Sequence, residues 1–183
     1  MKRKIVTAVL FASFVMTVYG ANWALATFGI VQLPFGFMGP AGVYFAGLAF
    51  GLRDALHEIG GVKIVLLAIL TGTIFSYIVE DGVVAPGGLV AIAVASASAF
   101  FLAEMADLLV YNPLRKKNWG TAVVLSNVVG SVTDSAVFLF LAFGSIDFIV
   151  GQTVGKITMI ALALPLVFVV RRASRAVSRN VFC

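Results

Sequence analysis

Carboxylate and amide side chains interrupt the apolar sequence between residues 104 and 144 of this 183-residue chain. The four that stand out are Glu104, Asp107, Asn127 and Asp134, each flanked by residues suited to hydrocarbon. An acidic side chain near the centre of a membrane helix costs roughly 2.5–3.5 kcal/mol on insertion scales, so it normally faces a partner, a water-filled cavity or a ligand. These residues can accept and donate hydrogen bonds, and we interpret them as the centre of a ligand-binding site.

The spacing of these residues places them on two helix faces. Glu104 and Asp107 are three residues apart, which puts them on one face of a helix. Asn127, Ser131 and Asp134 follow one stripe of the next apolar segment. The turn between the two segments, residues 112–118, is short, so the two helices should be antiparallel neighbours. Their polar faces can then lie inside one bundle.

The last apolar segment carries a third polar face. Gln152 and Lys156 are four residues apart and therefore share a face of a helix. A lysine at this depth either snorkels to the membrane surface or pairs with an acidic group. A salt bridge from Lys156 to Asp134 or Glu104 would hold the helices in register, and it is the structural alternative to a role in ligand binding.

The composition is that of an integral membrane protein. The chain is 61% hydrophobic and only 11% charged, with a mean hydropathy of +1.08. It has too little polar surface to cover a soluble globule of this size. The net charge of +5 comes from short basic clusters between apolar segments rather than from one basic helix face, so we expect no nucleic-acid partner.

Several motifs of enzymes and metal sites are absent from the sequence. The single cysteine, Cys183, excludes an intramolecular disulfide and a cysteine-based metal site. There is one histidine, His57, and no HExxH, Gly-x-Ser-x-Gly or nucleotide-binding loop. We therefore expect no enzymatic activity, no cofactor and no metal ion, and any ATPase that drives this protein would be a separate chain.

The hydropathy pattern predicts an all-α protein with one domain, residues 1–183, that spans the lipid bilayer six times. The second span follows an uncharged loop at residues 29–37. A cleavable signal peptide is the alternative for the first span, but its apolar run is longer than a typical signal core. The predicted spans are approximately residues 5–27, 38–58, 63–79, 88–111, 119–143 and 148–170.

The basic residues predict the orientation in the membrane. Apart from Lys156, every Lys and Arg is assigned to the N-terminus, the second loop, the fourth loop or the C-terminal tail. By the positive-inside rule both termini are then cytoplasmic, in a multi-pass protein of the cytoplasmic membrane. The residues concerned are Lys2, Arg3, Lys4, Arg53, Lys63, Arg115, Lys116, Lys117, Arg171, Arg172, Arg175 and Arg179.

The second apolar segment combines a packing motif with a charged end. Gly47 and Gly51 form a GxxxG pair, which lets a neighbouring helix approach closely. The segment ends in Arg53, Asp54, His57 and Glu58, in which residues four apart can pair locally. We interpret His57 as an interfacial residue of this cluster, and the sequence assigns the cluster no further role.

The segment from residue 102 to residue 144 resembles the VUT family of vitamin uptake transporters. It contains acidic residues before an aromatic, a Pro-Leu-Arg turn, an early Trp, Ser126-Asn127, Gly130, Asp134-Ser135 and the run from Phe138 to Gly144. The second-span sequence PAGVYFAGLAFGLRD is also similar to some members. Many members are described as queuosine precursor transporters. The resemblance implies a solitary importer whose fold is similar to the substrate-binding subunit of energy-coupling-factor transporters.

The implied cargo is 7-cyano-7-deazaguanine or 7-aminomethyl-7-deazaguanine, which are used to modify tRNA. A guanine-like base has adjacent N–H donors that a carboxylate can accept, while its carbonyl and ring nitrogens need amide donors. Trp23, Phe101 or Phe138 could stack on the ring. The candidate substrate-binding residues are Asp134, Asn127, Glu104, Asp107, Gln152, Lys156, Asn22 and Trp23. We expect the site among the first, fourth, fifth and sixth helices, toward the outer half of the membrane.

Two modes of action remain open. In the first, the chain alone imports the deazaguanine down its gradient with metabolic trapping, or coupled to protons through Asp134, Glu104 or Lys156. In the second, it is the substrate-binding subunit of an energy-coupling-factor transporter and needs ATPase and scaffold chains, which could dock on the small pair Ala8 and Ala12. Association with further copies of the chain is open in both. A purely structural protein would not need carboxylates on two helices and a lysine on a third.

Overall fold

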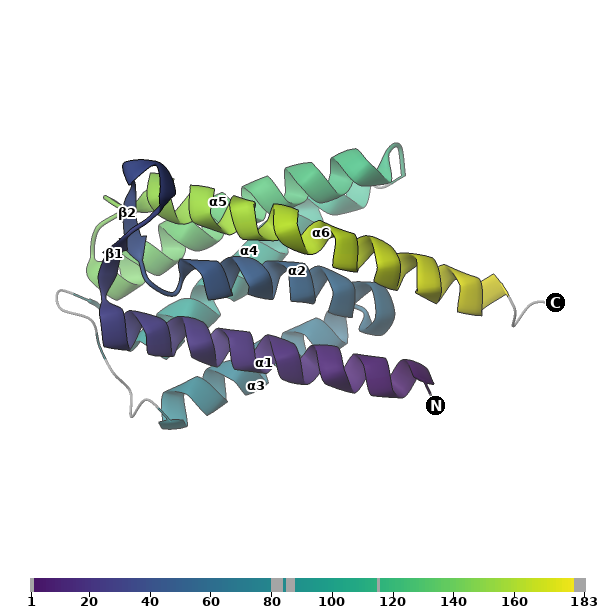
Figure 1. The fold of residues 1–183 in the computed structure, drawn as a ribbon, viewed down its shortest axis with the longest axis horizontal. Coiled ribbons are helices and arrows are strands. Elements are labelled where there is room, and N and C mark those ends of the chain that lie inside the picture. The colour runs from purple at the N-terminus through teal and green to yellow at the C-terminus, as the bar shows by residue number, and fades with distance from the viewer. Residues whose placement is uncertain (1, 80–83, 85–87, 115, 180–183) are drawn as a thin grey trace.

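A bundle of six helices and one short pair of strands forms the protein. The computed structural model describes residues 2–79, 84, 88–114 and 116–179. The helices pack side by side along one axis, and the strands lie at one end of the bundle (Figure 1). In chain order the elements are α1 (Lys2–Phe28), β1 (Ile30–Gln32), the 3₁₀ turn η1 (Pro34–Gly36), β2 (Met38–Pro40), α2 (Val43–Gly60), α3 (Val62–Val79), α4 (Ile92–Leu114), α5 (Trp119–Phe143) and α6 (Ile149–Arg179).

The helices have the length and composition of membrane spans, with one exception. In the part of the chain that the structure describes, α1, α3, α4, α5 and α6 are each long and apolar enough to cross a membrane. Helix α2 is also 18 residues long, but Arg53, Asp54 and Glu58 lower its apolar character. The chain is thus an all-α, multi-pass membrane protein, and α2 is its least apolar helix of this length.

The segment before α2 differs from the expected loop and span. Residues 38–40, which were expected to begin the second span, form β2 and pair antiparallel with β1, so that Ile30 lies opposite Pro40 and Gln32 opposite Met38. A residue that precedes a proline disfavours the helical conformation, so Gly39 remains extended and the helix begins only at Val43. The fourth helix likewise begins at Ile92 rather than at residue 88.

Helices α2 and α6 lie almost in backbone contact. A Cβ atom added to Gly47 would lie 2.7 Å from the Cβ of Met159, and one added to Gly51 would clash with Ala163. The GxxxG prediction is therefore confirmed, and α6 is the helix that approaches. Toward the strands, Gly155 of α6 gives the same close fit to Val43.

Helices α4 and α5 are antiparallel neighbours, as the short turn between them predicted, and they pack along most of their length (Figure 1). Helix α5 begins after Asn118, whose side-chain oxygen accepts a hydrogen bond of 3.2 Å from the backbone N–H of Thr121. This N-cap satisfies one of the backbone donors that a helix start leaves free.

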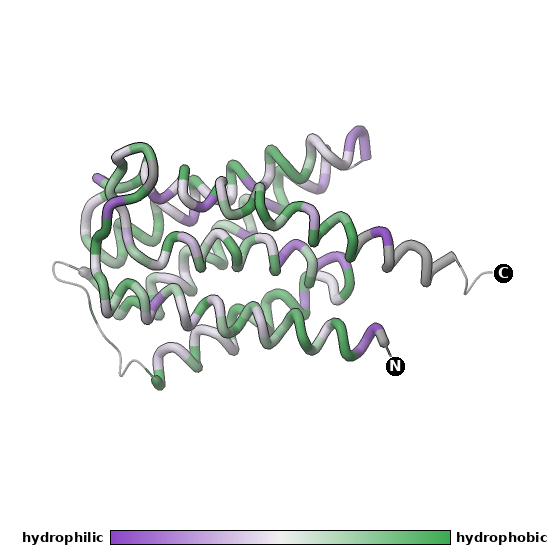
Figure 2. The backbone as a smooth tube through the Cα atoms, viewed as in Figure 1, coloured by the Kyte–Doolittle hydropathy of each residue, from purple (hydrophilic) through white to green (hydrophobic). Residues whose placement is uncertain are grey.

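The two ends of the bundle differ in charge. The start of α1, the C-terminal end of α6 and the α2–α3 and α4–α5 turns lie at one end, and hydrophilic residues gather there (Figure 2). We call this the basic end and the opposite one the hairpin end, because β1 and β2 lie there. The exposed cations at the basic end are Arg3, Lys4, Lys63, Lys116, Lys117 and Arg172.

Candidate functional site

Two polar cavities lie inside the bundle at different depths. The hairpin-end cavity has an empty volume of about 380 Å³ and is lined by residues of α1, α2, α4, α5 and α6, together with Pro40 of β2. The basic-end cavity has an empty volume of about 360 Å³ and is lined by the charged end of α2 with residues of α4, α5 and α6. Both volumes include the open space at the mouth of the cavity.

The hairpin-end cavity contains polar groups without protein partners. Asn22 of α1, Asp134 of α5 and Gln152 of α6 are all buried and all line it. Ser96 of α4 donates a hydrogen bond of 2.5 Å to the side-chain oxygen of Asn22. Within the described part of the chain, Asn22 Nδ2, Asp134 Oδ1 and Gln152 Oε1 have no hydrogen-bond partner. A buried polar atom without a partner costs about 1–3 kcal/mol, so this cavity is suited to a ligand or water that supplies the partners.

Lys156 balances the charge of Asp134 beside this cavity. The lysine is fully buried, and its Nζ donates hydrogen bonds to Asp134 Oδ2 and, at 3.1 Å, to Ser135 Oγ. The salt bridge predicted as the structural alternative is therefore present. It engages only one oxygen of the carboxylate, and the other is free to accept a hydrogen bond. The cavity thus offers a hydrogen-bond acceptor without an uncompensated charge.

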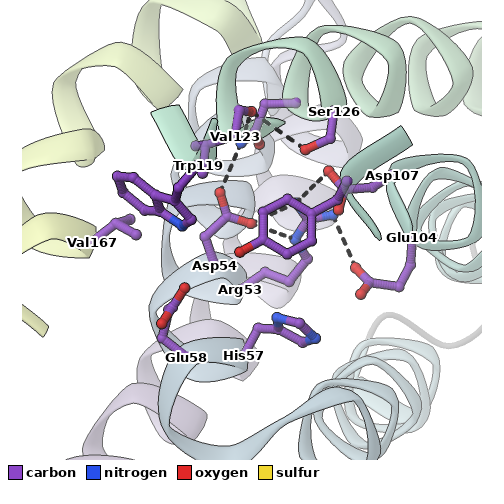
Figure 3. A pocket seen from close by; sticks show the side chains of 12 residues that line it. Arg53, Asp54, His57, Glu58, Glu104, Asp107, Trp119, Val123, Ser126 and Val167 are labelled. Atoms are coloured by element: carbon purple, nitrogen blue, oxygen red, sulfur yellow. Dashed lines mark hydrogen bonds and ion pairs between the residues drawn. The ribbon is translucent and has the colours of Figure 1, made fainter. Parts of the chain in front are cut away.

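Arg53 is the centre of the basic-end cavity, and sequence reasoning missed it. Only 2% of the residue is exposed, although it was assigned to the second loop and to local pairing with His57. Its Nη1 donates to Glu104 Oε2 at 2.9 Å and its Nη2 donates to Asp107 Oδ1 at 3.3 Å (Figure 3). Asp54 accepts hydrogen bonds from the same guanidinium at 2.6 and 3.0 Å. One buried cation therefore joins three carboxylates from two helices.

Asn127 connects this cluster to α5. Its side-chain nitrogen donates to Asp54 Oδ2 at 2.8 Å and to the backbone oxygen of Val123 at 2.9 Å. Its own side-chain oxygen has no partner among the described residues. The residues that we call the Arg53 network, namely Arg53, Asp54, Glu104, Asp107 and Asn127, thus link α2 to α4 and α5.

A charge count could have found Arg53. The predicted spans contain three acidic residues at depth, Glu104, Asp107 and Asp134, and Lys156 can neutralise only one of them. Apart from Lys63, the first residue of the third span, Arg53 is the only other Lys or Arg within a predicted span, because the second span was placed at residues 38–58. Buried carboxylates need a partner, so the remaining pair predicts an inward-facing arginine.

The predicted site residues divide between the two cavities. The hairpin-end cavity brings together Asn22, Asp134 and Gln152, with Lys156 paired behind it, and the basic-end cavity contains Glu104, Asp107 and Asn127. The residues that the sequence suggested for a single site therefore lie at two separate cavities. In the part of the chain that the structure describes, no group of three or more His, Cys, Asp or Glu side chains is arranged to hold a metal ion.

Trp23 lies outside both cavities, which corrects its assignment to the site. It is 44% exposed, and its ring packs edge to face against Phe28 at 5.7 Å. Consecutive helical residues point about 100° apart, so the burial of Asn22 turns Trp23 toward the outer surface. Phe101 is exposed for the same reason, and its neighbour Phe100 lines the hairpin-end cavity instead.

An aromatic layer lies between the two cavities. The rings of Phe50 and Phe100 are 5.4 Å apart, and Phe14 packs edge to face on Phe100 at 6.0 Å. Phe100 lines the hairpin-end cavity. On the other side of the layer, Cζ of Arg53 lies 5.1 Å from the centre of the Phe50 ring. Phenylalanine side chains thus connect the lining of one cavity to the lining of the other.

A comparison with known families identifies the family of this chain. Residues 40–170 match the family model described as "Putative vitamin uptake transporter". The matched region begins in β2 and includes α2 to α5 and most of α6, so it contains the whole Arg53 network and the Lys156–Asp134 pair. No curated protein and no solved structure matches the chain significantly.

Proposed function

Because the chain belongs to the vitamin uptake transporter family, we propose that it imports a queuosine precursor, 7-cyano-7-deazaguanine or 7-aminomethyl-7-deazaguanine, across the cytoplasmic membrane. It does so without an ATPase of its own. The observation that carries this proposal is the set of unpaired atoms in the hairpin-end cavity: Asp134 Oδ1 and Gln152 Oε1 as acceptors and Asn22 Nδ2 as a donor.

These atoms complement the polar edge of a 7-deazaguanine. The ring nitrogen and the exocyclic amino group are adjacent donors, which suit the oxygens of Asp134 and Gln152. The ring carbonyl is an acceptor, which suits the amide nitrogen of Asn22. Phe100 and Phe138 line the same cavity and supply apolar faces for the ring. A base with the opposite pattern would leave buried groups unpaired, at about 1–3 kcal/mol each.

The charge distribution supports import from the hairpin end. By the positive-inside rule the basic end faces the cytoplasm, so the hairpin-end cavity is in the outer half of the membrane. Pro40, the last residue of β2, and Gly42, which lies between the hairpin and α2, both line this cavity. A cargo arriving from outside would then meet the cavity beneath the hairpin.

Binding to purified protein tests the proposal. Thermal shift is measured with guanine, 7-cyano-7-deazaguanine and 7-aminomethyl-7-deazaguanine. The change Gln152→Leu removes an acceptor at nearly constant size and should weaken binding of a deazaguanine by about tenfold or more. The matched control is Gln32→Leu, which makes the same replacement on the exposed face of β1 and should leave binding unchanged. If a well-folded protein shifts with none of the three compounds, the purine assignment is wrong.

One observation supports a second candidate, a substrate-binding subunit of an energy-coupling-factor transporter. Ala8 and Ala12 are both exposed on α1, so this pair of small residues is available to a partner helix. Transport by the purified chain in liposomes separates the two candidates. Uptake without any added protein supports the solitary importer, and uptake only with ATPase and scaffold chains supports the subunit.

A further inference from the structure

We propose that the Arg53 network is the gate at the basic end of the transport path. It is closed in the structure, and it must break for cargo to leave the hairpin-end cavity toward the basic end. The inference rests on the proposed transport function. It gives Glu104, Asp107 and Asn127, which the sequence suggested as cargo ligands, a different role.

The network lies directly on the path between the cavity and the basic end. Phe100 lines the hairpin-end cavity, its ring contacts Phe50, and the ring of Phe50 contacts the guanidinium of Arg53. Arg53 in turn lines the basic-end cavity. Movement of cargo between the two cavities therefore requires the aromatic layer to open. Arg53 packs against this layer through the ring of Phe50.

The network also crosses a seam between two helix pairs. Helix α2 is in close backbone contact with α6, and α4 packs along α5. The backbone of α2 is much farther from the backbones of α4 and α5. Across this seam, the bonds of Arg53 to Glu104 and Asp107 and the bond of Asn127 to Asp54 connect α2 to α4 and α5. Separation of the pairs at the basic end would break all three bonds.

Buried ion pairs suit such a gate because their charged groups are stabilised both when they are paired with each other and when they are hydrated. In the closed state the guanidinium and its carboxylates lose their hydration and compensate by pairing with each other. In an open state the same groups face water, which replaces the lost hydrogen bonds. An apolar contact has no such compensation, since opening it would expose hydrocarbon to water. Three carboxylates around one arginine further favour hydration once the seam opens.

The salt bridge between Lys156 and Asp134 crosses the same seam on the other side of the aromatic layer. Lys156 is on α6 and Asp134 is on α5. Asp134 lines the cavity that we propose for the cargo, and its second oxygen has no partner among the described residues. The seam is thus bridged by ions at two depths, one beside the cargo and one at the exit.

Labelling of a single cysteine tests the gate without reference to any cargo. Cys183, the only native cysteine, is replaced by serine, and Ala46→Cys places a reporter on the wall of the hairpin-end cavity. A charged, membrane-impermeant maleimide is then applied from the basic-end side of oriented vesicles. We expect slow labelling of this parent and labelling faster by about tenfold in Arg53→Gln, because the closed state loses the interactions that favour it.

A second variant tests the gate in case the Arg53→Gln protein does not fold. Removal of Arg53 leaves two buried carboxylates and one partly buried carboxylate without their cation, and that protein could fail to fold. Glu104→Gln with Asp107→Asn removes charge at nearly constant shape and keeps Asp54 as the partner of Arg53. It should also be labelled faster from the basic-end side. The matched control is Lys117→Gln, which removes an exposed charge at the same end and should behave like the parent.

Two results would overturn the inference. One is an unchanged labelling rate from the basic-end side in the folded double variant. The other is an equal increase from both sides, which would mean general loosening of the bundle rather than a gate. Binding of 7-cyano-7-deazaguanine is measured in parallel, and a gate variant should retain affinity while its uptake rate changes. Failure of the cargo assignment would remove this last readout but leave the labelling result intact.

Discussion

Asp134 uses its two carboxylate oxygens for different purposes. Oδ2 accepts a hydrogen bond from the buried ammonium of Lys156, while Oδ1 has no partner among the described residues, and Asp134 lines the hairpin-end cavity. A side chain that fastens two helices is therefore also in reach of a bound molecule. Loss of its charge should affect stability and binding together, and the two effects can be separated.

The change Asp134→Asn should lower the free energy of unfolding by about 3–5 kcal/mol, because it leaves the charge of Lys156 buried without its carboxylate. The double variant Asp134→Asn with Lys156→Met removes both charges and should recover most of that loss. Thermal unfolding in one detergent checks both proteins. Equal destabilisation of the single and double variants would contradict the pairing.

The adjacent residues Asn22 and Trp23 provide a matched test of the cavity. Asn22→Leu removes the unpaired donor and should weaken deazaguanine binding by about tenfold or more. Trp23→Leu removes a larger side chain from the outer surface and should leave the dissociation constant unchanged within about threefold. Isothermal titration with 7-cyano-7-deazaguanine measures both. A larger effect at Trp23 would place the site elsewhere.

Of the two precursors, the cyano compound should bind more tightly near neutral pH. Its side group is uncharged, whereas the aminomethyl compound carries an ammonium, and Lys156 already neutralises Asp134, the acidic residue of this cavity. Desolvation of an unpaired cation opposes its binding. Competition between the two compounds for one labelled ligand measures the ratio. Tighter binding of the ammonium form would mean that another carboxylate reaches the cavity.

Packing of α2 on α6 should tolerate no added side chain at Gly51. Gly51→Leu would collide with Ala163 and should reduce the yield of folded protein sharply, since helix backbones in contact cannot separate locally. Gly120→Ala, in the first turn of α5, meets only a side-chain oxygen of Asn118 at 3.5 Å and should be neutral or slightly stabilising. Fluorescence-detected size-exclusion chromatography compares the two variants.

Hydropathy predicted the helices well because each one needs a long apolar stretch, and such a stretch is visible without any knowledge of its neighbours. The pair of Lys156 and Asp134 was also predictable, since opposite charges deep in a membrane are stabilised by forming a salt bridge with each other. The β hairpin was not, because strands of three residues leave no periodic pattern to detect.

The locations of Arg53 and Trp23 could not be predicted from the sequence alone. Arg53 lies among charged residues at a helix end, where an interfacial location is the usual interpretation. Its burial is explained by the salt bridges to Glu104 and Asp107, which are distant in the sequence. Trp23 looks suited to stacking, but helix geometry gives the inner position to Asn22. In both residues the outcome depends on which face the bundle buries, and that is a property of all six helices together.

The location of Arg53 also has a consequence for biogenesis. Helix α2 carries three charged residues, so it is a poor candidate for independent entry into a bilayer. Its arginine finds Glu104 only 51 residues later in the chain, on a helix that emerges from the ribosome after α2 and α3 are complete. We expect α2 to wait at the membrane surface or inside the translocation machinery until α4 arrives, so that Arg53 enters the lipid together with its acidic partners on α4.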